Sequence, residues 1–311
     1  MQTMQSPTAS AASVQSRKRR DRMRNLVAYS FIAPNFIGFA VFTLVPMIMA
    51  VVLAFLQWDG SWANPIRFVG LQNFLDIFQD AKFRQALFNT IAYAIITVPL
   101  TMAASLGLAI LLSQKIRARN FFRTMIFFPY VASMVAVTAV WNMLFNPSMG
   151  PVNMILSSLG VENLPRWSAD PNWFICMGTV ILFSIWKFMG YYMIIYLAGL
   201  QGVNPDLYEA AALDGANAWQ RFRYVTLPQL RPTTFFVTVM LTIQCFKVYD
   251  IFLMITNFGP GGKTRVLVGN IYEAAFSSRN FGYASAMAMV LFILVLIVTL
   301  IQFRGEKSAN E

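Results

Sequence analysis

Six long apolar runs follow one another along the chain, separated by shorter polar segments. They cover residues 26–56, 88–112, 121–145, 173–197, 233–256 and 283–303. A helix needs about 20 apolar residues to cross the hydrocarbon core of a bilayer. The pattern therefore predicts an all-α integral membrane protein with six transmembrane helices in one domain, residues 25–311. The polar, basic segment 1–24 that precedes it is predicted to be a disordered tail.

The composition agrees with a membrane domain and excludes several kinds of site. Hydrophobic residues make up 57% of the chain and charged residues only 12%, against about 25% in soluble proteins. With no histidine, a histidine-based triad or zinc site is excluded, and Cys176 and Cys245 both fall inside predicted spans. No phosphate-binding loop of the Walker type is present. We therefore expect no catalytic residues, no metal site and no cofactor.

The positive charges indicate an orientation. The net charge is +11, but the basic residues do not form one face, as nucleic-acid binding would require. They gather at alternate ends of the spans: Arg17, Lys18, Arg19, Arg20, Arg22 and Arg24; Lys115, Arg117, Arg119 and Arg123; and Arg221, Arg223 and Arg231. By the positive-inside rule both termini lie in the cytoplasm. The basic tail also favours an anionic lipid surface.

A polar segment between the fourth and fifth spans, residues 204–232, predicts two short helices. Asn204 can cap a first helix that opens with Pro205, and Gly215 supplies a left-handed stop. Asn217 and Gln220 have the spacing of a capping box for a second helix. We expect that helix to end before Pro228, because a proline disfavours helical geometry in the residue before it.

This segment resembles the EAA loop of binding-protein-dependent ABC importer permeases. The matching positions are Glu209, Ala210, Ala211, Asp214, Gly215, Ala216, Phe222, Leu227, Pro228 and Pro232. Two further blocks resemble the carbohydrate branch of that family: residues 68–74, and positions from Phe246 to Ala286 that include Asp250, Gly259-Pro260 and Gly282-Tyr283-Ala284-Ser285-Ala286. One departure is Phe258, where the family usually carries glycine, so the resemblance does not define the shape of that outer loop.

The resemblance implies a fold, partners and roles. The fold would be a type I ABC importer transmembrane domain with a cytoplasmic coupling helix, in a bacterial cytoplasmic (inner) membrane. The partners would be a second permease, usually in a heterodimer, two ATP-binding subunits and an extracytoplasmic binding protein that delivers a sugar. Glu209 would contact the ATPase, Ala210 and Ala211 would permit close approach, and Asp214, Gly215, Ala216 and Pro228 would shape the loop. The chain would be a pore subunit and not an enzyme.

Polar residues inside the spans are candidates for the substrate pathway, because such residues are costly in lipid. Lys187 and Tyr191 fall in the fourth span. Gln244, Lys247 and Asp250 follow at a spacing of three in the fifth, so a continuous helix would place them on one stripe. Lys247 and Asp250 could instead pair with each other or with a partner helix, and tyrosines at helical spacing are often only packed.

Two other classes of protein stay open at this point. A self-contained secondary transporter or channel would use the same polar stripe, but the sequence shows no clearly paired discontinuous helices and only Asp250 as an acid within a span. A membrane receptor or scaffold would have no need of the elbow at 204–232.

Overall fold

The computed structural model describes residues 11–61, 63–114 and 116–310. The chain divides into two compact units, residues 1–53 and 54–311. Each unit is described here by itself.

The first unit is one long helical rod. It consists of α1 (Ala11–Phe39), a π-helical turn η1 (Ala40–Leu44) and α2 (Val45–Leu53). The disorder predicted for residues 1–24 does not extend to residues 11–24, which lie in α1; residues 1–10 are outside the described part. No glycine or proline interrupts the chain between Ala11 and Arg24, so the helix of the apolar run continues into the basic segment.

The π-helical turn in this unit lies directly before a proline. The backbone N–H of Val45 reaches back five residues to the carbonyl of Ala40, and Pro46 follows. Proline has no N–H, and its ring clashes with the carbonyl four residues earlier in a regular helix. The wider turn lets the helix pass the proline without ending.

The second unit is a helical bundle with short connecting elements. Its membrane-length helices are α4 (Ala81–Ser113), α8 (Trp173–Gln201) and α15 (Phe281–Asn310). The shorter elements are β1 (Leu56–Gln57), β2 (Arg67–Phe68), α3 (Gln72–Gln79), α5 (Arg119–Val131), α6 (Met134–Leu144), α7 (Pro151–Ser158), η2 (Trp167–Ala169), α9 (Pro205–Leu213), α10 (Ala218–Arg221), η3 (Phe222–Thr226), α11 (Leu227–Gln229), α12 (Arg231–Phe246), α13 (Asp250–Thr256), η4 (Pro260–Gly262), α14 (Leu267–Tyr272) and η5 (Glu273–Ser277). The two strands pair antiparallel, with Leu56 opposite Phe68.

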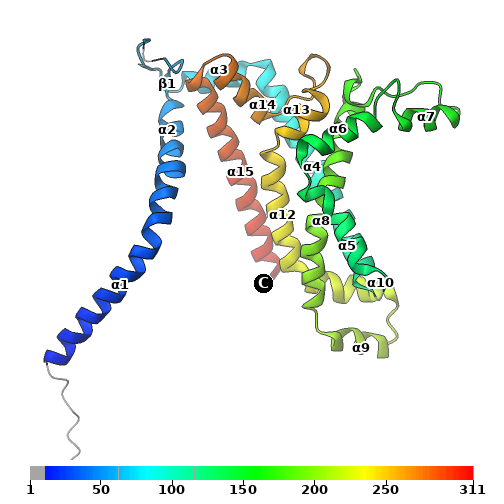
Figure 1. Cartoon of the computed structure of the whole chain (residues 1–311), viewed down its shortest axis with the longest axis horizontal. Helices are drawn as coiled ribbons and strands as arrows, with labels where there is room; N and C mark the ends of the chain where they lie inside the picture. The colour runs from blue at the N-terminus through cyan, green and yellow to red at the C-terminus, as the bar shows by residue number, and fades with distance from the viewer. Residues whose placement is uncertain (1–10, 62, 115, 311) are drawn as a thin grey trace, which may run out of the picture. The chain divides into compact units, whose positions relative to one another are not determined.

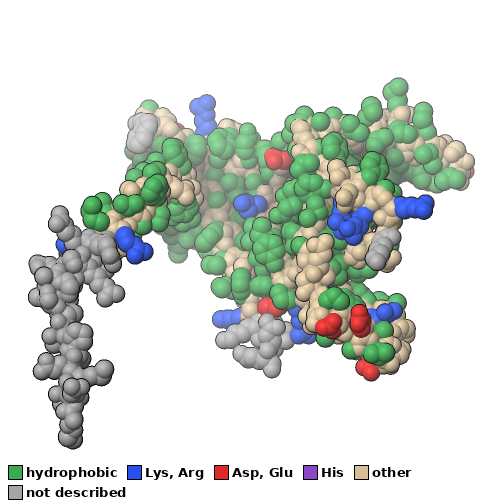
Figure 2. Space-filling view, turned by 60° about the horizontal axis from the view of Figure 1, so that its bottom comes forward, with side chains coloured by type: hydrophobic (Ala, Val, Ile, Leu, Met, Phe, Trp, Pro, Cys, Tyr) green, Lys and Arg blue, Asp and Glu red, His purple; other side chains and the backbone are tan. Residues whose placement is uncertain are grey.

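The core of this bundle lies between α4, α8, α12 and α13. Tyr93, Phe183, Met193, Leu241 and Phe252 are almost completely buried there. A second apolar cluster joins α3, α4, α14 and α15. These contacts hold the spans together, and most of the remaining apolar side chains stay on the outside, as Figure 2 shows for one face.

Two of the six predicted spans are broken helices and not continuous ones. The predicted run 121–145 is α5 followed by α6, bent by 100°, and the run 233–256 is α12 followed by α13, bent by 57°. The described residues therefore hold four continuous helices long enough to cross a membrane, or six spans if each bent pair counts as one. From the sequence we expected no clearly paired discontinuous helices, and this expectation is wrong.

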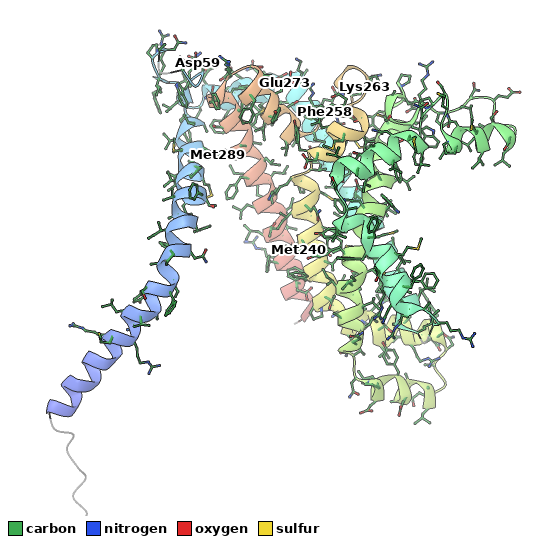
Figure 3. All side chains as sticks on the ribbon, viewed as in Figure 1. Asp59, Met240, Phe258, Lys263, Glu273 and Met289 are labelled. Atoms are coloured by element: carbon green, nitrogen blue, oxygen red, sulfur yellow. The ribbon has the colours of Figure 1, made fainter. Side chains whose placement is uncertain are left out.

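The bundle has two different ends. Figure 1 shows α9 and α10 at one end, and α3, α13 and α14 at the other. Figure 3 places Phe258, Lys263 and Glu273 at the α13 end and Met240 part of the way along α12, between the two ends. The two helix breaks lie between these ends, where each one leaves backbone groups that need partners.

Candidate functional site: a central cavity and a capped elbow

The two broken helices border one cavity of about 440 Å³. Lys187, Gln244, Lys247 and Asp250, four of the five residues predicted for the substrate pathway, line it. Met134, Phe188, Met240, Ile243, Val248, Tyr249 and Ile251 complete the lining. The cavity therefore combines apolar walls with a few polar groups, as small-molecule sites commonly do.

Lys187 caps the break between α5 and α6. Its Nζ donates hydrogen bonds to the carbonyl oxygens of Pro129 at 2.6 Å, Ala132 at 2.9 Å and Tyr130 at 3.3 Å. These carbonyls lie at the C-terminal end of α5, which carries the negative end of the helix dipole. Lys187 is only 7% exposed. Lys187 therefore lines the cavity wall and also stabilises the end of α5, a structural role that the sequence did not predict.

A glycine next to this lysine allows α8 and α5 to approach closely. A Cβ atom at Gly190 would meet the carbonyl oxygen of Ile126 and would lie 2.8 Å from the Cα of Phe127. The close approach brings the end of α5 within reach of Lys187, one turn earlier on α8.

The tyrosines of α8 have different roles from one another. Tyr191 does not line the cavity; its ring stacks on Tyr130 of α5, with centroids 4.4 Å apart and planes 14° apart. The neighbouring Tyr192 donates a hydrogen bond of 2.9 Å from its hydroxyl to Oε1 of Gln244. This bond fixes the orientation of the Gln244 amide at the cavity wall.

The sequence predicted that Lys247 and Asp250 share one helical stripe with Gln244, and this prediction is wrong. The helix α12 ends at Phe246, Lys247 takes its C-cap position, and Asp250 opens α13. Lys247 and Asp250 do not pair with each other either, since no ion pair between the two is found in the described part of the chain. Both side chains are exposed at the break.

The sequence also missed part of this site. Met134 and Met240 line the cavity, yet a methionine in an apolar run carries no signal of its own. The α5 break had a signal, since Pro129 precedes it and Ser133 occupies the position before α6. Among the described residues no group of three or more His, Cys, Asp or Glu side chains is arranged to hold a metal.

The elbow between α8 and α12 has the caps that its sequence predicts. The side chain of Asn204 accepts a hydrogen bond from the backbone N–H of Asp206 at 3.0 Å. Asn217 and Gln220 form the complete capping box, with bonds of 2.8 and 2.9 Å. Gly215 adopts φ +78° with open space around it. The expected pair of helices, α9 and α10, is present with the expected turn between them.

The end of the elbow differs from its prediction. The second helix does not stop before Pro228 but continues from α10 through the π-helical turn η3 into α11, which contains that proline. The backbone N–H of Leu227 bonds to the carbonyl of Phe222, five residues back. This is the arrangement found before Pro46, and it relieves the same ring clash.

The surface of the elbow is both acidic and apolar. Glu209, Ala210, Asp214 and Pro228 are exposed, and Ala211 and Ala216 are half-buried. Large apolar side chains are exposed beside them: Leu213 at 90%, Tyr224 at 75% and Trp219 at 68%. Acidic side chains gather near the lower edge of the view in Figure 2. Such a combination is typical of a surface that binds another protein.

The loop after α13 is built around Phe258. Asn257, Phe258 and Gly259 all have positive φ, of 46°, 64° and 71°. The Phe258 ring lies against Gly269, where a Cβ would come within 2.8 Å, and the guanidinium carbon of Arg265 lies 5.3 Å from the ring centroid. Asn89 anchors the loop to α4 through bonds to the carbonyl oxygens of Lys263 and Arg265.

Comparison with known proteins gives the class to which this architecture belongs. The model of the family described as binding-protein-dependent transport system inner membrane component matches residues 100–308. The chain is 34% identical over 289 residues to the probable ABC transporter permease protein YurN of Bacillus subtilis, covering 92% of this chain and 98% of the relative. It is 33% identical over 301 residues to the lactose transport system permease protein LacF of Rhizobium radiobacter, covering 94% and 98%.

A solved structure is similar over nearly the whole chain. It is the crystal structure of a bacterial ABC transporter involved in the import of the acidic polysaccharide alginate. One chain of that transporter superposes with a TM-score of 0.82 at 25% identity, covering 95% of this chain and all of the other.

The chain belongs to the family of binding-protein-dependent transport system inner membrane components. It is thus a multi-pass inner membrane permease of an ABC importer, with the type I transmembrane fold that the resemblance implied, and not an enzyme. Family membership, and not the continuity of its helices, is what separates it from a self-contained secondary transporter.

Proposed function

We propose that this permease imports a sugar. Support comes from its relatives, whose names include a lactose permease, a trehalose/maltose permease from Thermococcus litoralis and an alginate importer. The substrate would pass through the cavity at the two helix breaks. The Gln244 amide and the rim formed by Lys247 and Asp250 offer donors and acceptors to sugar hydroxyls, and Tyr249 and Met240 offer apolar contact.

The elbow α9–α10 would couple transport to ATP hydrolysis on a separate pair of ATP-binding subunits. The observation that carries this proposal is the exposed Glu209 on a helix pair fixed by Asn204, Gly215 and the Asn217–Gln220 box. A helix pair with both starts capped moves as one body, which suits the transmission of a hinge motion to the spans. A second permease, in a heterodimer, would complete the pore.

The orientation of the chain is part of the proposal. The charge pattern favours both termini and the elbow in the cytoplasm, with the Phe258 loop facing the binding protein outside. Single cysteines at Ser157 and Ser277 should react with a membrane-impermeant thiol reagent added outside, and one at Ser308 should not. External labelling at Ser308 alone would reverse this orientation.

A charge reversal tests the coupling role. Glu209→Lys should leave the permease in the membrane but abolish substrate-stimulated ATP hydrolysis in reconstituted vesicles, because the charge-assisted contact to the ATPase becomes repulsive. Glu162→Lys is the matched control: it is also exposed, but it lies in the loop after α7, at the other end of the bundle (Figure 1). Full stimulation in Glu209→Lys, with the ATPase still bound, would remove the elbow from the coupling path.

A further inference from the structure

A second cavity, of about 520 Å³, lies at the elbow end of the bundle. It is bordered by the C-terminal ends of α4 and α8, the start of α5 and the helix α10 of the elbow. Three arginines line it: Arg119 and Arg123 from α5, and Arg221 from α10. We call it the arginine cavity.

The positive charge of this cavity is not balanced by the chain itself. Of the residues that the structure describes, no Asp or Glu lines it, and none of the three arginines is in an ion pair. The Nη2 atom of Arg123 donates to the carbonyl oxygen of Leu112 at 3.2 Å, which holds that guanidinium against α4. The chain therefore positions the charge without neutralising it.

Two of the guanidinium donors are buried and have no partner. The Nε atoms of Arg123 and Arg221 are both inaccessible to solvent and form no hydrogen bond. A buried donor without an acceptor costs about 1–3 kcal/mol, and more when it is charged. The two guanidinium groups come from different elements and reach one cavity, and the permease chain supplies no acid there to balance them.

We propose that the arginine cavity binds a phosphate group, and that its source is the headgroup of an anionic phospholipid. A guanidinium presents parallel donors that match phosphate oxygens. The cavity also lies at the start of α5, a helix without a side-chain N-cap, whose positive dipole end favours an anion.

The rest of the lining favours a lipid over free phosphate. Ile110, Leu197, Leu200 and Phe222 give the cavity an apolar wall beside the arginines. Phe121 and Phe122, next along α5, are exposed at 64% and 41%. An apolar wall of this kind accommodates the glycerol and first acyl carbons of a lipid, whereas inorganic phosphate gains nothing from it.

A phosphate bound here would join the elbow to a transmembrane helix. Arg123 belongs to α5, and Arg221 lies beside the Asn217–Gln220 box of α10. Both would donate to the same group across the cavity. This site goes beyond the transport proposal, since its occupancy can be measured without a sugar, an ATPase or a known orientation.

The test is lipid retention by the full-length permease. The chain is placed in nanodiscs made of equal parts phosphatidylglycerol and phosphatidylcholine. The protein is then released from the nanodisc, and the lipid that stays bound to it is identified by native mass spectrometry. Wild type should retain phosphatidylglycerol. Arg123→Gln and Arg221→Gln should each weaken retention about tenfold, the effect of losing one hydrogen bond to a charged group.

Arg117→Gln is the matched control, since Arg117 is exposed in the loop before α5 and does not line the cavity; it should retain lipid as wild type does. Arg221→Lys keeps the charge and serves where a glutamine variant fails to fold, with retention between wild type and Arg221→Gln.

Inorganic phosphate that displaces the lipid and binds lipid-free protein through the same arginines would support phosphate chemistry but assign a soluble source. Equal retention of both lipids, with no phosphate binding, would overturn the proposal, as would an arginine dependence seen only for attachment of the ATPase.

Discussion

The side-chain nitrogen of Lys187 lies 2.6 Å from the carbonyl oxygen of Pro129, which is 58 positions away in the chain. This bond joins the middle of one transmembrane helix to the end of another. With the bonds to Tyr130 and Ala132, it supplies the partners that α5 loses when it stops inside the bundle. A lysine first considered for substrate contact thus explains why a 100° break is stable.

Replacing this lysine should destabilise the permease. Lys187→Met keeps the length of the side chain but leaves three carbonyl groups without their donor, at a cost on the order of 3 kcal/mol. The thermal unfolding midpoint of the purified protein should fall clearly, whereas Lys247→Met, at an exposed position of the same cavity, should change it little. Equal midpoints for wild type and Lys187→Met would show that these bonds do not stabilise the break.

The features that the sequence predicts correctly are those that depend on contacts between residues close together in the chain. The elbow was predicted in detail because each of its caps joins residues two or three positions apart: Asn204 with Asp206, and Asn217 with Gln220. The breaks after Val131 and Phe246 were not predicted. Their partners come from other helices, such as Lys187 for α5. The local signal at Pro129 does not decide the outcome by itself, because Pro99 lies inside the continuous helix α4.

The same reasoning applies to the prolines. A proline normally ends a helix, and on that basis the second elbow helix was expected to stop before Pro228. The structure passes both Pro46 and Pro228 through a π-helical turn. No residue of η1 or α2 is buried, so the wider turn itself, and not packing around it, lets the helix continue past Pro46.

Two glycines of α8 provide a matched test of helix packing. Gly190→Ala would push α5 away from α8, since the new methyl group meets the backbone of Ile126, and should cost about 1–3 kcal/mol. Gly178→Ala, on the same helix, meets nothing within 4 Å and should stabilise by up to about 1 kcal/mol through helix propensity. Thermal unfolding of the two variants under identical conditions gives the comparison; stabilisation by both would contradict the close approach.

The turn of the elbow should require the left-handed backbone conformation of Gly215, and not the space that a missing side chain leaves for a neighbour. There is open space around the residue, so only the left-handed φ restricts it. Gly215→Val should disturb the turn at a cost of roughly 1–2 kcal/mol, whereas Gly215→Asn tolerates this conformation. Substrate-stimulated ATPase activity should therefore be lost in the valine variant and largely kept in the asparagine variant. A loss of the same size in both would mean that the ATPase requires the glycine surface itself.

The cavity assignment predicts different results for Gln244 and Tyr191. Gln244→Ala removes a polar group from the wall and should lower sugar uptake roughly fivefold, the effect of about 1 kcal/mol. Tyr191→Phe keeps the ring that stacks on Tyr130 and should transport normally, whereas Tyr191→Ala should not. Uptake is compared at equal amounts of assembled transporter. Impaired uptake in Tyr191→Phe would mean that its hydroxyl contacts the substrate after all.

The unusual Phe258 should reveal how backbone strain and side-chain packing balance in the loop after α13. Its φ of 64° is unfavourable for a bulky residue such as phenylalanine, while its ring packs on Gly269 and beneath Arg265. Phe258→Ala and Phe258→Gly both lose the ring, but only alanine keeps the strained φ. Both variants should therefore be less stable than wild type, with Phe258→Gly about 1 kcal/mol more stable than Phe258→Ala. Thermal unfolding would measure the difference, and a glycine variant less stable than the alanine variant would contradict a left-handed backbone at this position.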